Sequence, residues 1–135
     1  KNKGTGAKVA EIKLNMSNVH APRLGNLFSV PVDDKWVEGI LYASAISING
    51  GIHNVIFVAT VNNSVYAFDA DTLGPPLWLK NFNGTGRPSK NTDFGAAGSY
   101  CPLGGYYDFR GNIGIVGTPV IDGSTATLFF VTRTV

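Results

Sequence analysis

A hairpin signature in the middle of the chain constrains the fold more than any other feature. The run Val55–Val61, V-I-F-V-A-T-V, is continuously apolar and is bounded by turn residues, which is typical of a strand buried on both faces. Asn62 and Asn63 follow it, and Asn tolerates the positive φ angles of a two-residue type I′ turn. Residues Ser64–Asp69 then return with the alternation of a second strand. This segment predicts a buried antiparallel hairpin.

Other strand patterns extend the hairpin into a meander. Strands are predicted at residues 27–32 and 40–48 before it, the second ending at the turn signal Asn49-Gly50-Gly51, and at residues 77–82 after it. Two more are predicted at residues 113–121 and 127–134, joined by a turn at Asp122-Gly123-Ser124. The 17 Gly and seven Pro, with many β-branched and aromatic residues, favour strands and turns over helices. The expected fold is all-β, built from antiparallel four-stranded meanders.

The last two predicted strands repeat the earlier pattern. Leu128–Thr132 can be placed on Val55–Ala59 at an offset of 73 residues. Removing a thirty-residue insert leaves a period of about 43, which is the size of a four-stranded β-propeller blade. The expected organisation is an extended lead-in (1–25), a first blade (26–82), an inter-blade loop (83–112) and the first half of a next blade (113–135).

Residues 67–78, A-F-D-A-D-T-L-G-P-P-L-W, resemble the blade motif of quinoprotein-like (PQQ-like repeat) β-propeller proteins, roughly A-x-D-x-x-T-G-x-x-x-W. The matching residues are Ala67, Asp69, Thr72, Gly74 and Trp78, with Leu73 as an insertion. The stretches L-F-S-V-P-V-D and G-I-V-G-T-P-V-I-D add a resemblance to secreted, mostly bacterial members. The resemblance implies a partial propeller in which the Trp packs between blades, the Ala allows blades to approach, and the Asp and Thr bond backbone groups in the turn.

The two acids of this motif, Asp69 and Asp71, allow three interpretations: a calcium loop, a catalytic carboxylate pair or a structural corner. A calcium loop requires a further oxygen ligand where Leu73 stands and a distal Glu. A turn at Asp71 would separate the two carboxylates, and short Asp and Thr side chains stabilise turns. The pattern therefore favours the structural corner. We predict no catalytic residue and no metal ligand.

The best candidate for a ligand or partner surface is the inter-blade loop. Residues 83–112 contain seven glycines and no long apolar run. A loop this long is typically functional or mobile. Its aromatic residues are Phe94, Tyr100, Tyr106, Tyr107 and Phe109. Aromatic residues with Gly can form a carbohydrate or protein contact; the alternative is a loop packed on its own aromatics.

Charge and hydropathy exclude several partners. Only 15% of residues are charged, the net charge is +2, and the basic residues are scattered, which argues against nucleic acid. No apolar run reaches about 18 residues, so no membrane span is expected. Cys101 is the single cysteine, and the two histidines, His20 and His53, stand in separate turn-like segments, so no Cys- or His-based zinc site is expected. Three N-x-[ST] sequons, at Asn15, Asn62 and Asn83, are possible glycosylation sites in a secretory context.

Three functional hypotheses result. The favoured one is a non-enzymatic propeller module for binding or assembly in a secreted or cell-surface protein, without a cofactor. The first alternative is part of a PQQ-dependent dehydrogenase, for which the resemblance implies a quinone and calcium in a closed funnel. The second is a carbohydrate-binding or sugar-active propeller. An incomplete propeller exposes sheet faces and edges, so the expected partners are further blades of the same polypeptide or other protein chains.

Overall fold

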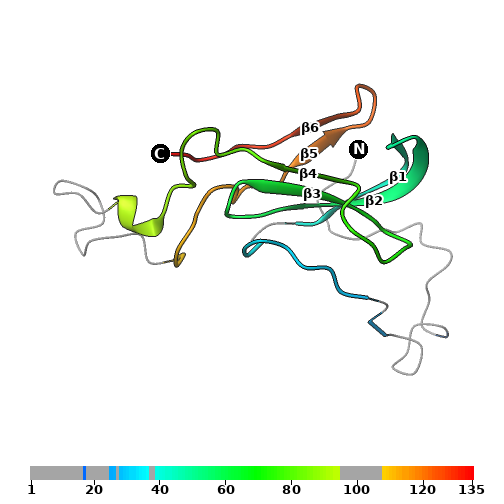
Figure 1. Ribbon diagram of the computed structural model, residues 1–135, viewed down its shortest axis with the longest axis horizontal. Helices are drawn as coiled ribbons and strands as arrows, with labels where there is room; N and C mark the ends of the chain where they lie inside the picture. Colours follow the sequence, from blue (N-terminus) through cyan, green and yellow to red (C-terminus); the bar gives the residue numbers. More distant parts are fainter. Residues whose placement is uncertain (1–16, 18–24, 27, 37–38, 95–107) are drawn as a thin grey trace.

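The computed structural model describes residues 17, 25–26, 28–36, 39–94 and 108–135, and within these ranges the chain is mostly β-structure (Figure 1). Four strands form one antiparallel meander in the order β1-β2-β3-β4, and two more form a hairpin, β5-β6. The strands are β1 (Leu41–Ile48), β2 (Gly51–Ala59), β3 (Ser64–Asp69), β4 (Trp78–Asn81), β5 (Val120–Asp122) and β6 (Thr127–Phe129). The predicted antiparallel four-stranded meander is confirmed.

The turn between β1 and β2 has the geometry that its sequence predicts. Asn49 and Gly50 have φ angles of 51° and 78°, and Ile48 pairs directly with Gly51. Positive φ at both central residues is the requirement of a type I′ turn, whose twist matches that of the two strands. The Asn-Gly pair thus fixes this end of the sheet.

The loop between β2 and β3 differs from the predicted two-residue turn. Only Asn63 has a positive φ, 59°, and its N–H donates to Thr60 O at 3.1 Å, while Thr60 N–H donates to Ser64 O at 2.9 Å. The loop is therefore one residue longer than predicted and ends in a left-handed residue, the common three-residue hairpin geometry. The longer loop places Ala59 opposite Val65 and Val55 opposite Asp69.

One face of the four-stranded sheet carries an aromatic and aliphatic cluster. Tyr66 and Phe68 on β3 stack with ring centroids 5.5 Å apart and pack with Val58 on β2. Val30 and Val32 cover this cluster. Residues 28–32 do so without forming the predicted strand, which is a correction. Pro31 lacks an N–H for a ladder, and Asp33 N–H donates to the Tyr66 hydroxyl at 3.0 Å instead.

The β5–β6 hairpin lies against the opposite face of the sheet (Figure 1). Phe130, just after β6, meets the ring of Phe82 edge-on at 4.8 Å. Ile121 and Leu128 are paired across the hairpin and face the side of the sheet that carries Trp78. The described part of the chain therefore contains two β layers, which are joined by the Phe82–Phe130 contact and border a shared apolar space.

Both strands predicted near the end of the chain are much shorter in the structure. Strand is limited to Val120–Asp122 and Thr127–Phe129, so the predictions of 113–121 and 127–134 were wrong in extent. The backbone of some of the remaining residues bonds to other segments. Gly114 N–H donates to Val61 O at 2.8 Å, and residues 133–135 exchange bonds with Arg87 and Ser89 at 2.9–3.1 Å.

Replacing Gly114 with Ala is expected to destabilise the fold. A Cβ at this position would overlap Asn63 Oδ1 and lie 2.6 Å from Val61 O, both in the hairpin loop. Forcing extra volume into a packed site costs about 1–3 kcal/mol of unfolding free energy. Urea denaturation of Gly114→Ala measures this. The control is Gly117→Ala, whose Cβ would meet nothing within 4 Å; equal stability losses in the two variants would contradict the prediction.

Candidate functional site

The corner after β3 is organised by the carboxylate of Asp69. Its Oδ1 accepts hydrogen bonds from the N–H groups of Asp71, at 2.8 Å, and Thr72, at 2.9 Å. These bonds satisfy two backbone donors at the point where the chain leaves the sheet, which is the usual role of Asp in a turn. The backbone N–H of Thr72, rather than its side chain, is the group that the corner uses.

The second oxygen of Asp69 binds a histidine. His53 Nδ1 lies 2.6 Å from Asp69 Oδ2, and both side chains are partly exposed. The hydrogen bond from His53 is the main reason that the pKa of Asp69 is lowered, with the N–H of Asp71 as the next contribution. His53, predicted to stand in a turn-like segment, lies within β2, on the same face as Asp69 and diagonal to it across the hairpin.

The carboxylate of Asp71 is bound separately. Asn54 Nδ2 donates to Asp71 Oδ2 at 2.8 Å, and Asn54 Oδ1 accepts from Ala45 N–H at 3.3 Å. Ala45, at φ 56°, lies in the irregularity of β1 where the register with β2 shifts. The carboxylates of the two acids thus have different side-chain partners, His53 for Asp69 and Asn54 for Asp71. Their bonds join the corner to β1 and β2.

The other motif residues occupy contrasting environments. Ala67 is fully buried in β3, directly opposite both Phe57 and Trp78. Gly74 has open space around it and no positive φ, so the structure does not require Gly there. The inserted Leu73 is 62% exposed. The insertion therefore extends an exposed part of the corner.

Trp78 borders a pocket between the two β layers. The ring centroids of Trp78 and Phe82 are 6.3 Å apart. Trp78 lies between the sheet and the hairpin, yet the residue is 37% exposed. The pocket has a volume of about 310 Å³. Its walls are chiefly apolar: Phe57 and Trp78 from the sheet, Ile121 and Leu128 from the hairpin, and Ile46 and Ile48 at the β1 end. Among the described residues, no Asp, Glu, Lys, Arg or His lines it.

Asp33 is a structural residue that the sequence analysis missed. Its carboxylate accepts hydrogen bonds from Thr60 Oγ1 at 2.9 Å, from Asn62 Nδ2 at 2.7 Å and from Ser64 Oγ. Burial alone would raise the pKa of Asp33, but the bonds from Ser64, Asn62 and Thr60 outweigh burial and lower it. The segment before β1 is thereby attached to the β2–β3 loop. An acidic residue before a strand carries no sequence signal for such a distant contact.

Two of the three sequon asparagines use their side-chain amides within the fold. Asn62 Nδ2, the atom to which a glycan would be attached, donates to Asp33. Asn83 Nδ2 donates to Asn62 O at 3.2 Å, and Asn83 Oδ1 accepts from Asn63 Nδ2 at 2.9 Å. Asn15 lies outside the described residues. The folded arrangement therefore assigns Asn62 and Asn83 a structural role.

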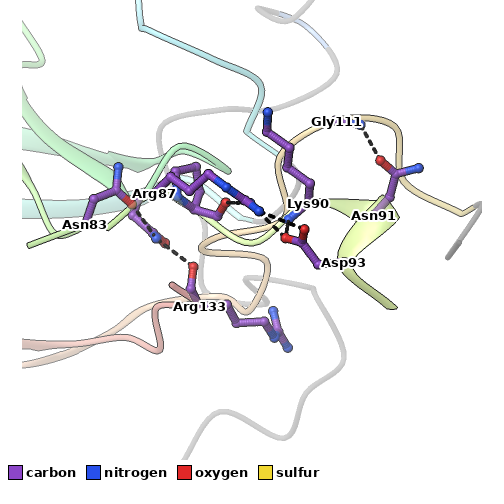
Figure 2. A network of polar contacts seen from close by, with 9 residues as sticks. Asn83, Arg87, Lys90, Asn91, Asp93, Gly111 and Arg133 are labelled. Atoms are coloured by element: carbon purple, nitrogen blue, oxygen red, sulfur yellow. Dashed lines mark hydrogen bonds and ion pairs between the residues drawn. The ribbon is translucent and has the colours of Figure 1, made fainter. Parts of the chain in front are cut away.

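A small irregular sheet closes the base of the long loop. Residues 88–91 bond on one side to residues 133–135 and on the other to residues 111–113, through Asn91 N–H to Gly111 O at 3.0 Å and Ile113 N–H to Ser89 O at 2.8 Å. Figure 2 shows Arg87 reaching Asp93 within this stem. The ion pair is bidentate, at 2.8 and 2.9 Å. With the N–H of Lys90 it lowers the pKa of Asp93 to about 2.

The aromatic residues predicted to form a ligand surface are only partly covered by the structure. Phe94 ends a short 3-10 helix, Asn91–Phe94, and is 42% exposed, while Phe109 is half-buried. Tyr100, Tyr106 and Tyr107 lie outside the described residues. The aromatic surface on this loop therefore stays a prediction.

Comparisons with known proteins add no assignment. The chain matches no family model, no curated protein and no solved structure. Within the described ranges, no three His, Cys, Asp or Glu side chains gather as metal ligands would. No helix in that part of the chain is long and apolar enough to cross a bilayer.

Removing the His53 side chain is expected to raise the pKa of Asp69 towards its ordinary value of 3.8. The pKa should stay below 3.8, because the N–H groups of Asp71 and Thr72 still bind the carboxylate. Because the folded-state pKa is depressed, ionised Asp69 stabilises the fold above pH 3.8, and this is lost as pH falls through the folded pKa. In His53→Ala, the free energy of unfolding should therefore fall less between neutral and acid pH than it does in the wild type.

Carboxyl carbon NMR titration measures this change directly. Asp122 is the internal control, because its pKa is lowered by contacts with Ser124 in the separate β5–β6 hairpin. An unchanged Asp69 titration in His53→Ala, or an equal shift at Asp122, would show that the His53 contact does not set the pKa.

Proposed function

We propose that this chain is a non-enzymatic assembly module, in which the β5–β6 hairpin forms an inner layer between the four-stranded sheet and a further β-sheet. In the finer form of the proposal, the layers are blades of a β-propeller in a secreted or cell-surface protein. The partners are further blades of the same polypeptide or other protein chains.

The main support for this proposal is that the β5–β6 hairpin is apolar on both faces. Ile121 and Leu128 face the sheet, while Val120, Phe129 and Val131 on the other side are 61%, 57% and 70% exposed. Strands that are apolar on both faces are typical of sheets covered on both sides. Burying each such side chain is worth about 1.5–3 kcal/mol, so a covering layer would stabilise the hairpin substantially.

The internal repeat supports the same arrangement. At the offset of 73 residues, Phe129 aligns with Ile56 and Val131 with Val58. Ile56 and Val58 lie in the cluster that Tyr66 and Phe68 complete in the four-stranded sheet. At this offset β5 and β6 correspond to β1 and β2. No described strand pairs with β6 as β3 pairs with β2. A neighbouring strand and layer would complete the pattern.

The Asp69–Thr72 corner and the position of Trp78 are also consistent with a blade role. The corner uses its acids for backbone and strand contacts, as the resemblance implies for a structural motif. Trp78 lies between one sheet and the next hairpin. Both features support assembly by packing of β layers.

The proposal predicts that the isolated 135-residue chain self-associates through the outer face of the hairpin. Phe129→Glu should reduce self-association at micromolar concentration, measured by sedimentation velocity, because a charge cannot be buried there without large cost. Leu73→Glu is the control, since Leu73 is equally exposed, at 62%, but lies in the corner. A wild-type chain that is monomeric and melts cooperatively would refute the proposal.

A further inference from the structure

We propose that the pocket between the Trp78 face of the sheet and the β5–β6 hairpin is a binding site for a neutral, apolar small molecule. This inference does not rest on the assembly role, because it concerns the contact between two layers within this chain. The size of the pocket, the chemistry of its walls and the contacts that join those walls support this assignment.

The volume suits a small ligand. At about 310 Å³ the pocket lies at the lower end of the range for small-molecule sites, roughly 300–1,000 Å³. An apolar cavity of about 150 Å³ is already large enough to bind a benzene ring. The pocket therefore has room for a fused bicyclic aromatic molecule or a branched aliphatic one of similar size.

The uncharged walls of the pocket disfavour a charged ligand. Phe57 and Trp78 offer aromatic surface on one side, and Ile121 and Leu128 offer aliphatic surface on the other. Ser47 and Thr127 are the polar residues in the lining, and neither carries a charge. An ionised ligand would lose its hydration here without an opposite charge to replace it. A neutral molecule would lose little, and could use a hydroxyl for orientation.

The two walls are joined at one end by contacts outside the pocket. Phe82 and Phe130 meet edge-on at 4.8 Å. Beyond them, Arg87 and Val135 exchange backbone hydrogen bonds of 2.9 and 3.0 Å. These contacts join the chain after β4 to the chain after β6. Trp78 accordingly stays 37% exposed although it lies between two β layers. Water in such a space would find few polar partners, so an apolar ligand would displace it favourably.

The test uses N-phenyl-1-naphthylamine, a neutral probe that fluoresces in apolar surroundings and accepts energy from tryptophan. The chain has two Trp residues, so Trp36→Phe leaves Trp78 as the only donor. Saturable quenching of Trp78 emission at one probe per chain is expected. The anionic analogue 8-anilino-1-naphthalenesulfonate should bind at least about tenfold more weakly, because its charge must be desolvated. Absence of Trp78 quenching, or equal affinity for the two probes, would overturn the proposal.

Adjacent residues of β6 provide a matched pair of variants. Because each variant adds a Trp donor, binding to them is read from directly excited probe fluorescence. Leu128→Trp fills the pocket and should abolish probe binding, whereas Phe129→Trp alters the outer face and should leave it unchanged. Loss of binding in Phe129→Trp with retention in Leu128→Trp would assign the probe to the exposed outer face and overturn the inference. If circular dichroism shows that Leu128→Trp is unfolded, the Trp78 quenching and the comparison of the two probes decide the question.

Discussion

The side chain of Asn63 joins segments that lie far apart in the sequence, and the two-layer arrangement depends on it. Its left-handed backbone closes the β2–β3 loop, and its Nδ2 donates to Asn83 Oδ1 and to Arg133 O at 2.9 and 2.8 Å. Its carbonyl accepts from Phe82 N–H at 2.8 Å, and Gly114 packs against its Oδ1. Burying an amide is costly unless it is bonded. Both donors of Nδ2 are used, whereas Oδ1 is buried with no hydrogen-bond partner among the described residues, so the two Nδ2 bonds must be in place together. One residue thus couples the sheet to the chain that follows β4 and β6.

The corner at Asp69 acts at the other end of the same hairpin. There the bonds are made by partly exposed carboxylates to His53, Asn54 and two backbone N–H groups. Exposed polar contacts of this kind contribute less to stability than buried ones, but they define the path of the chain. The buried loop and the exposed corner together fix the direction in which β4 leaves, and hence the position of Trp78 on the sheet.

Local sequence patterns predicted the elements well where a single short-range rule decides. The Asn49-Gly50 turn and the strand Ser64–Asp69 are examples, and the meander order follows from them. The prediction was wrong where long-range bonds compete. Residues 28–32 contain a strand-like pattern but pack as a cover on Tyr66 and Phe68. The pattern at 131–134 is equally strand-like, but residues 133–135 pair with the 87–89 segment, which no local rule indicates.

The candidate site was less predictable than the fold. A two-residue loop at Asn62-Asn63 would have shifted the register by one residue and placed Asp69 opposite Ile56 rather than Val55. The contact of His53 with Asp69 therefore depends on a detail of loop length. The pocket lies between apolar residues of the sheet and apolar residues of the β5–β6 hairpin. Its existence depends on how the hairpin packs on the sheet, which the sequence of a single strand does not indicate.

The stem around residues 88–91 has a consequence for how this chain can vary. The ends of the long loop are held by backbone bonds on both sides and by the Arg87–Asp93 pair. Once two ends are fixed, doubling the length of the intervening chain costs only about 0.6 kcal/mol of closure entropy. Related chains could therefore lengthen, shorten or replace this loop with little effect on the sheets. The contacts of residues 87–91 thus separate variation in the loop sequence from the stability of the sheets.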